Sequence, residues 1–278
     1  MVNLRHLSLL ALLLAGAQSP VGAAPPERVV SMNLCTDQIA MLVAAPGQLY
    51  SVSHLSADPR ISAMATEAEE LVINHGLAEE IYLMEPDLVI AGSFSTRATV
   101  EMLKRLGMPV AVFEPAYGLD DVRERLQQMG EVLGQEDTAR SLIEDLDQRL
   151  DVLRAAVGHR PSAALYYANG YTSGDRTLAG QILIAAGFEN AAAAAGYSSG
   201  GVLPLEVLAM LDPEAVITGH RYPGASRAED ILDHPVVQTL REGRASGAIT
   251  DRDWVCGTPF VLSAIEDLST VRKDLLAD

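Results

Sequence analysis

The sequence lacks several motifs and residue types on which whole protein classes depend. It contains no phosphate-binding P-loop, no Gly-x-Gly-x-x-Gly fingerprint and no His pair of the zinc-protease type. Lys and Arg number 20 against 37 Asp and Glu, which gives a net charge of −17. Nucleic acids and anionic membranes attract basic surfaces, so this balance disfavours both as partners. No nucleophile–base constellation is recognisable, and we expect a binding protein, not an enzyme.

Tryptophan and cysteine are also scarce. One Trp, Trp254, and two cysteines, Cys35 and Cys256, occur in 278 residues. Two cysteines do not make a disulfide framework, and each follows a predicted strand in a different half of the chain. We expect two partly buried free thiols. A bridge that ties the two halves together is the alternative, since an oxidising compartment permits it.

Residues 1–24 have the pattern of a cleavable secretory signal. A weakly basic start precedes an apolar core from Leu7 to Ala17, and small residues follow at 21–23. The apolar core is too short to span a bilayer comfortably. Ala17 occupies the position at which a lipoprotein has its lipidated cysteine. We therefore expect an exported, periplasmic protein that is not lipidated.

A helix–strand unit occurs twice and indicates the fold class. Residues 79–92 read EEIYLMEPDLVIAG, and residues 206–219 read EVLAMLDPEAVITG, which align without a gap. In each copy an amphipathic helix ends at an acidic residue and Pro. The apolar run that follows, closed by Gly, suits a strand buried on both faces of a parallel sheet. Two copies predict an α/β protein with two similar lobes.

The segment between the repeats is expected to be helical. Residues 119–157 carry apolar side chains at helical spacing, Gly134 interrupts them, and the second part is roughly 30 Å long at 1.5 Å per residue. We interpret it as a spacer between the lobes, with an ordinary crossover helix as the alternative. Before it, Thr36 or Asp37 is expected to cap the first helix. The predicted domains are a signal peptide (1–24), an N-terminal lobe (25–118), linker helices (119–158) and a C-terminal lobe (159–278).

Polar and aromatic side chains collect where the predicted strands end. In open α/β sheets, ligands bind beyond the carboxyl ends of the strands. Aromatic faces with a few hydrogen-bond donors suit a large, partly apolar small molecule. If the two lobes face each other, these loops line one cleft. The candidate ligand-binding residues are Asn33, Cys35, Thr36, His75, Ser93, Phe94, Arg97, Tyr117, Asn169, Tyr171, His220, Arg221, Tyr222 and Trp254.

Three histidines raise a second possibility. His54, His75 and His220 lie at predicted strand ends or turns, and with a carboxylate they offer ligands for a bare transition metal. None of them has a partner at helical i, i+4 spacing. We therefore expect no metal site and no resident cofactor, and the histidines contact a ligand or solvent instead.

Glu79 and Glu206 open the helix in the two copies of the repeat. The helix dipole favours a carboxylate at this position, which is a sufficient structural reason for both. Equivalent positions in two lobes also place one acid on the surface of each lobe. A partner with two Arg pockets could bind such a pair.

These motifs together resemble the substrate-binding proteins of ABC importers for iron–siderophores, haem and vitamin B12. The resemblance rests on the opening Arg28-Val-Val-Ser-Met-Asn-Leu, the two Glu…Pro…Gly segments, the long central helix and Asp253-Trp254 with Pro259. It implies two Rossmann-like lobes with parallel sheets, joined by a rigid interdomain helix, and a ligand held between them. We expect the protein to work as a monomer.

The resemblance also implies a partner and a class of cargo. Glu79 and Glu206 would dock onto Arg residues of a membrane permease dimer that is coupled to its ATPase. The cargo would be a metal chelate, and Trp254 would pack against the ring of a corrinoid such as vitamin B12. We rank a corrinoid first, a ferric siderophore second and haem third.

Departures from the family pattern qualify this ranking. The single Trp rules out a Trp-rich cleft, so Tyr and Phe would have to substitute. Arg97 and Arg221 are the only well-placed arginines for an anionic siderophore. Ligation of haem iron stays open through four residues, His75, Tyr171, His220 and Tyr222.

Overall fold

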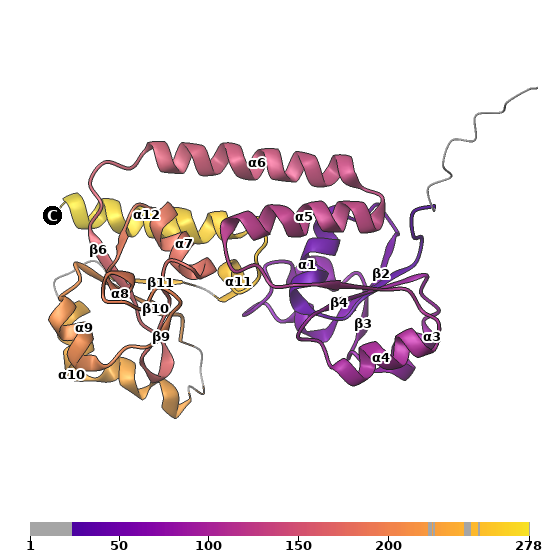
Figure 1. Ribbon diagram of the computed structural model, residues 1–278, viewed down its shortest axis with the longest axis horizontal. Coiled ribbons are helices and arrows are strands. Elements are labelled where there is room, and N and C mark those ends of the chain that lie inside the picture. The colour runs from indigo at the N-terminus through magenta and orange to yellow at the C-terminus, as the bar shows by residue number, and fades with distance from the viewer. Residues whose placement is uncertain (1–23, 222–223, 225, 242–245, 250, 278) are drawn as a thin grey trace, which may run out of the picture.

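The protein consists of two α/β lobes below a layer of long helices (Figure 1). This computed structural model describes residues 24–221, 224, 226–241, 246–249 and 251–277. The predicted signal peptide therefore lies outside the described residues, apart from Ala24. Within the described part, no helix combines the length and the apolar character needed to cross a membrane.

The N-terminal lobe contains a five-stranded parallel sheet. Its strand order is β3-β2-β1-β4-β5. The strands are β1 (Val29–Ser31), β2 (Leu49–Ser53), β3 (Val72–Asn74), β4 (Leu88–Gly92) and β5 (Val110–Phe113). Its helices are α1 (Leu34–Val43), α2 (Ala65–Ala68), α3 (Ala78–Leu83) and α4 (Arg97–Arg105), with a 3-10 turn at His54–Ala57. The strand order reverses direction between β1 and β4, where such sheets form ligand crevices.

Two details of this lobe differ from the sequence-based expectation. β3 was not predicted, because it is a three-residue edge strand in which Val72 remains 40% exposed. The first helix starts at Leu34, and its N-cap is Asn33, whose side chain accepts a hydrogen bond from the Cys35 amide. The predicted cap at Thr36 or Asp37 is therefore wrong, since both residues lie inside the helix and are buried.

Two antiparallel helices connect the lobes. They are α5 (Leu119–Leu133) and α6 (Glu136–Ala155), and Gly134 separates them in a left-handed conformation with φ of 66°. A residue with a side chain is disfavoured there, so the glycine defines the break. α6 has the predicted 20 residues and runs along both lobes (Figure 1).

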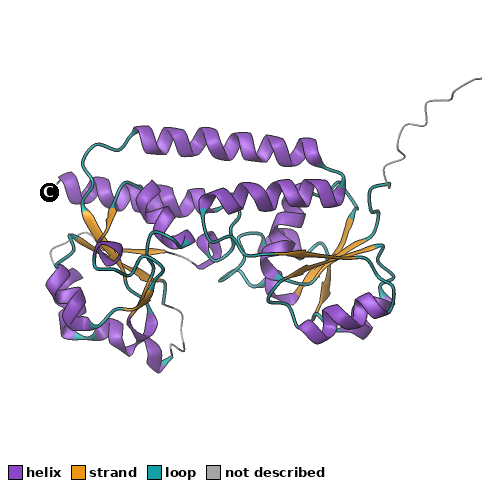
Figure 2. Cartoon of the chain, viewed as in Figure 1, coloured by secondary structure: helices purple, strands orange, loops and turns teal. Residues whose placement is uncertain are grey.

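The C-terminal lobe has a four-stranded parallel sheet in the order β11-β10-β6-β8, and β7 pairs with β9 in a small antiparallel ribbon. Figure 2 shows helices around both sheets. The strands are β6 (Ser162–Leu165), β7 (Tyr171–Thr172), β8 (Glu189–Asn190), β9 (Gly201–Val202), β10 (Ala215–Gly219) and β11 (Ser246–Ile249). The helices are α7 (Leu178–Ala185), α8 (Ala191–Ala194), α9 (Leu205–Leu211), α10 (Pro235–Arg241), α11 (Asp251–Trp254) and α12 (Val261–Ala277), with 3-10 turns at Ala168–Gly170 and Arg227–Asp233.

The duplicated unit is confirmed as α3–β4 in one lobe and α9–β10 in the other. The strands occupy equivalent positions of the alignment, Leu88–Gly92 and Ala215–Gly219. Glu85 and Asp212 occupy equivalent positions before Pro, and both adopt left-handed backbone angles, with φ of 49° and 44°. Non-glycine residues seldom do so. The two copies thus share an unusual helix ending as well as a sequence pattern.

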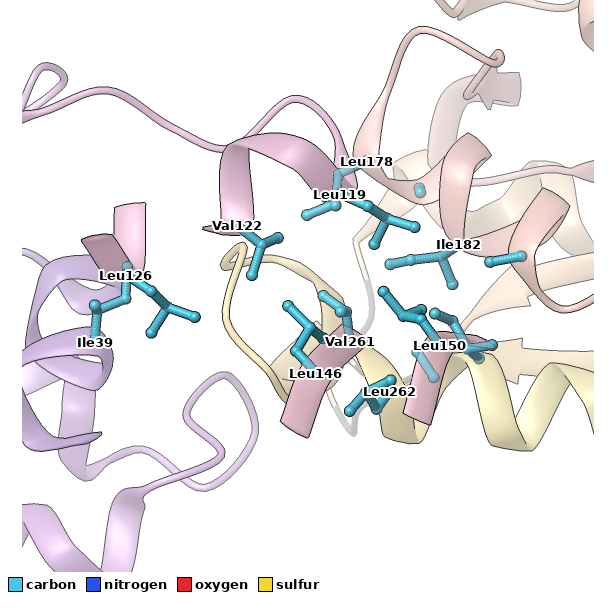
Figure 3. Packing of buried hydrophobic residues seen from close by; sticks show 14 of the residues in the cluster. Ile39, Leu119, Val122, Leu126, Leu146, Leu150, Leu178, Ile182, Val261 and Leu262 are labelled. Atoms are coloured by element: carbon cyan, nitrogen blue, oxygen red, sulfur yellow. The ribbon is translucent and has the colours of Figure 1, made fainter. Parts of the chain in front are cut away.

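One apolar cluster runs through both lobes and the helices between them (Figure 3). It includes Ile39 of α1, Leu126 of α5, Leu146 of α6, Ile182 of α7 and Leu262 of α12, all buried. Protein interiors are close-packed and have low compressibility, so a core of this kind resists deformation when one lobe is displaced. The shared core therefore restricts movement of one lobe against the other.

Candidate ligand site at the lobe junction

A hollow of about 110 Å³ lies at the carboxyl ends of β1, β4 and β5. This is where the strand order of the N-terminal sheet reverses. Five of the predicted ligand-binding residues come together around it: Asn33, Cys35, Thr36, Ser93 and Phe94. The sequence-based expectation that strand-end residues converge is therefore met on this side of the site.

Hydrogen bonds fix the polar side chains of this hollow. Asn33 packs over Gly92, where an added Cβ would lie 3.0 Å from Asn33 Cγ. Ser93 Oγ donates to Glu114 Oε2 at 2.7 Å. Thr36 is buried, and its hydroxyl donates to the Asn33 carbonyl at 3.0 Å. Thr36 thus shapes the floor of the hollow, while the other polar groups lie nearer its surface.

Cys35 and Cys256 form a disulfide, with their Cα atoms 5.0 Å apart. The expectation of two free thiols is therefore wrong. Cys35 lies in the first turn of α1, and Cys256 follows α11, so the carboxyl ends of the two sheets meet here. The bond links the two lobes directly beside the hollow.

A close approach of the two lobes supports this junction. A Cβ placed on Gly257 would lie 2.0 Å from Ala116 Cβ, so only glycine fits at this position. On the other side of Ala116, the Leu119 amide donates to Gln181 Oε1 at 2.7 Å. The segment after β5 therefore contacts the C-terminal lobe twice, at Gly257 after α11 and at Gln181 of α7.

Trp254 brings an aromatic face to the same junction. Its indole stacks on the Tyr167 ring, with centroids 5.7 Å apart and the planes inclined by 10°. Both side chains are partly buried and pack against the shared core. Burial, followed by the negative charge of Asp251, raises the pKa of the Tyr167 phenol, which therefore stays neutral. The pair forms a rigid aromatic wall.

One carboxylate of the C-terminal lobe, Asp251, lies near this wall. Burial raises the pKa of Asp251, and the charge of Glu229 acts in the same direction. His220 and the Trp254 side chain oppose this shift. His220 is exposed at the end of β10. It thus lies within electrostatic range of the carboxylate that neighbours the aromatic wall.

His54 and His75 lie together at the ends of β2 and β3. Their rings stack with centroids 5.3 Å apart, and His75 Nδ1 is 3.2 Å from Glu80 Oε1. Across the part of the chain that the structure describes, no three His, Cys, Asp or Glu side chains are arranged to hold a metal ion. His220 in the other lobe does not join the pair as a third metal ligand.

A buried carboxylate supports the turn that carries His54. Asp37 Oδ2 accepts hydrogen bonds from the Ser53 amide and from Ser56 Oγ, at 3.0 and 2.7 Å. Burial raises the pKa of Asp37, and the serine hydrogen bonds oppose this shift. Asp37 therefore anchors the 3-10 turn after β2.

The remaining predicted ligand-binding residues that the structure describes do not line the hollow. Tyr117 and Tyr171 are 58% and 45% exposed, and Arg97 and Asn169 are exposed as well. The Arg221 guanidinium donates to Asp233 and to the Glu229 carbonyl, so its charge is already paired. Tyr222 lies outside the described residues. Contact of these residues with a ligand stays a prediction.

Three residues near the site were missed from the sequence. Arg125 of α5 lines the hollow, and its Nε is buried without a hydrogen-bond partner. Glu114 also lines it, and Tyr167 stacks on Trp254. Glu114 directly follows β5, and Tyr167 is the second residue after β6, so the strand-end rule applied to every strand would have found them. Arg125 comes from a helix and gave no local signal.

Glu79 and Glu206 lie away from the site. Both are exposed in the first turns of α3 and α9, at the outer sides of the two lobes (Figure 1). The two helices lie on the side of the molecule opposite α6. The acids therefore do not contribute to the hollow.

Solved structures with the same fold cover nearly the whole chain. A periplasmic haem-binding protein from Roseiflexus sp. RS-1 is 21% identical, with a TM-score of 0.72, and the match covers 90% of this chain and 98% of that one. The periplasmic vitamin B12-binding protein of Vibrio cholerae is 19% identical, with a TM-score of 0.65, and the match covers 91% and 99%. The two-lobe α/β fold class is thereby confirmed.

A curated relative extends the comparison to the sequence. A cobalamin-binding protein of Halobacterium salinarum is 28% identical over 204 residues, which are 70% of this chain and 54% of that protein. The chain thus spans about half the length of the curated relatives it matches first. The family described as periplasmic binding protein matches residues 29–245, which is most of the sequence. With this match and the two-lobe architecture, the chain belongs to the periplasmic binding protein family.

Proposed function

We propose that this protein is a periplasmic receptor that captures a metal chelate and delivers it to an ABC permease dimer and its ATPase. A corrinoid is the first candidate cargo, a ferric siderophore the second and haem the third. The receptor works as a monomer after removal of its signal peptide, carries no lipid and breaks no bonds in its cargo.

The Trp254–Tyr167 wall beside the hollow, in which a few polar groups line a mainly apolar surface, is the observation that carries this proposal. The stacked rings belong to one lobe, the hollow belongs to the other, and the disulfide joins them. A large, flat chelate has an apolar ring face and a polar edge. Such a ligand would place its ring on the wall and its polar groups among Asn33, Ser93 and Arg125.

Charge supports the order of the candidates. Of the residues lining the hollow, Arg125 alone carries a positive charge, and its Nη2 is paired with Glu124 Oε2 at 3.0 Å. Arg221 is paired with Asp233, and the chain has a net charge of −17. An anionic catecholate siderophore needs several cations to replace its hydration. A corrinoid amide needs hydrogen bonds, which the hollow can offer.

Calorimetric titration with cyanocobalamin, a ferric hydroxamate and haemin tests the cargo, with Trp254 fluorescence as a second signal. We expect saturable one-to-one binding of cyanocobalamin, and a Trp254→Phe variant that binds it without the fluorescence change. Failure of all three chelates, together with binding of zinc or manganese, would contradict the chelate proposal and favour a bare-metal receptor. Chelate recovered unchanged after incubation, by mass spectrometry, supports a receptor over an enzyme.

One sequence match bears on the enzyme alternative. Residues 196–200 have the Gly-x-Ser-x-Gly spacing, but they form turns between α8 and β9. A nucleophile elbow requires a strand, a sharp turn and a helix in that order. Ser198 Oγ lies 3.2 Å from Arg176 Nη2, and Arg176 also reaches Ser199. The local structure therefore favours a binding protein.

Delivery is tested by removing the two outer acids. We expect Glu79→Ala with Glu206→Ala to leave chelate affinity unchanged and to abolish uptake, because a permease would bind these carboxylates through Arg. The matched control replaces one exposed glutamate of each lobe elsewhere, Glu67→Ala with Glu189→Ala. Lost chelate affinity in the first double variant would place the acids in ligand binding instead.

A further inference from the structure

The two outer helices share a second exposed feature besides their acids. Leu83 and Met210 occupy equivalent positions of the repeat, each four residues after Glu79 or Glu206. They are 79% and 84% exposed. Residues four apart lie on the same face of a helix. Each lobe therefore presents a carboxylate and a large apolar side chain side by side.

We propose that Leu83 and Met210 dock, with the two glutamates, onto two equivalent sites of the permease dimer, each combining an Arg with an apolar surface. This inference rests on the proposed delivery function. A single exposed Leu is common on protein surfaces and needs no explanation. An exposed glutamate with an exposed apolar residue four positions later, repeated at matching positions of both lobes, does need one. A symmetric dimer presents each surface twice, so it suits a partner on which the docking element is duplicated.

The element in the N-terminal lobe is the larger of the two. Around Leu83, a hollow of about 310 Å³ is lined by Ala78, Glu79, Tyr82, Met102 and Leu106. Tyr82, Met102 and Leu106 are 48%, 48% and 46% exposed. Contiguous exposed apolar surface of this kind marks interaction sites. The exposed acid at its rim selects a basic partner, so the site combines shape, apolar contact and charge.

The C-terminal element depends on fewer contacts. Met210 is exposed on α9, while Ala209 occupies the position equivalent to Tyr82. A Met side chain adapts to different surfaces because it is unbranched and polarisable. The N-terminal site should therefore contribute more to the affinity for the permease. The C-terminal site should provide the second, weaker contact.

Binding to the cognate permease–ATPase complex in nanodiscs, measured by biolayer interferometry, tests the proposal with full-length mature protein. We expect Leu83→Ser with Met210→Ser to weaken binding at least tenfold, and Leu83→Ser alone to weaken it more than Met210→Ser alone. Cyanocobalamin affinity should stay within twofold of wild type in all three. The control is Val152→Ser on α6, a 70% exposed apolar residue on the opposite side of the molecule.

The possible results separate this inference from the delivery function. Wild-type affinity in Leu83→Ser with Met210→Ser, while Glu79→Ala with Glu206→Ala abolishes binding, would overturn the apolar contribution and leave delivery intact. A loss as large in Val152→Ser would also overturn it, since the effect would then not be specific to the two helices. Absence of nanodisc binding by the wild type would contradict the delivery function itself, and the inference with it.

Discussion

The two lobes contribute different surfaces to one site. The N-terminal side is a small hollow with a mainly apolar lining, in which a hydrogen bond holds Ser93 and close packing holds Asn33. The C-terminal side is the Trp254–Tyr167 stack, which packs on the shared core. The first side can orient polar groups, and the second can cover an apolar face. The two lobes share the same helix–strand unit, but the loops at their strand ends differ. The two sides of the site are therefore complementary and not identical.

The largest effect is expected from the link between these halves. Replacing both cysteines, Cys35→Ser with Cys256→Ser, opens a loop with a sequence separation of 221 residues. Loop-closure entropy then predicts a loss of about 3–5 kcal/mol in the free energy of unfolding. Urea denaturation measures it, and reductant should lower the wild type to the level of the variant without affecting the variant. Equal stability of the two proteins under oxidising conditions would show that the shared core alone joins the lobes.

A smaller effect is expected on ligand affinity, and it should distinguish the aromatic wall of the C-terminal lobe from the hollow of the N-terminal lobe. Trp254→Ala removes the aromatic wall and should raise the Kd for cyanocobalamin about 30-fold, or about 2 kcal/mol, as for a buried aromatic anchor. Phe94→Ala should change it less than fivefold, because Phe94 lines the hollow but is 79% exposed. Calorimetry gives both values, and Trp254→Phe should recover most of the affinity. The reverse order would place the apolar contact on the N-terminal side.

The smallest effect concerns pH and the N-terminal lobe alone. The folded pKa of Asp37 is raised above its usual 3.8 by burial. Between pH 3.8 and this raised pKa, the folded state retains the proton that the unfolded chain releases. The free energy of unfolding therefore falls as the pH rises above 3.8. Asp37→Asn does not titrate and should lack this component. Urea unfolding of both proteins from pH 4 to 7 should show the wild type losing stability relative to the variant.

Local sequence patterns were sufficient for the repeated unit and for the connecting helices. Residues 88–92 and 215–219 form strands because continuous apolar runs suit a sheet covered on both faces. Gly134 separates α5 from α6 because it adopts a left-handed conformation that other residues disfavour. Strand β3 was missed, since three residues at a sheet edge leave no periodic signal.

Candidate site residues were predictable to the extent that strand ends converge. Asn33, Ser93 and Phe94 were found this way, whereas Arg125 was missed because it reaches the hollow from a helix far along the chain. The pairing of Arg221 with Asp233 was equally invisible. Such contacts depend on which side chains face each other across elements, and spacing in the sequence does not encode that.

The sequence by itself determined the duplicated helix–strand unit, the break at Gly134 and the matching positions of Glu79 and Glu206. Each of these features can be recognised in a short stretch of neighbouring residues. Only the tertiary structure decided that Cys35 pairs with Cys256 and that Trp254 stacks on Tyr167 beside the hollow. The solvent exposure of Leu83 and Met210 likewise became known only from the tertiary structure. The physical reason is that burial and pairing between distant segments depend on how the two lobes pack, and a short window of sequence contains no record of that packing.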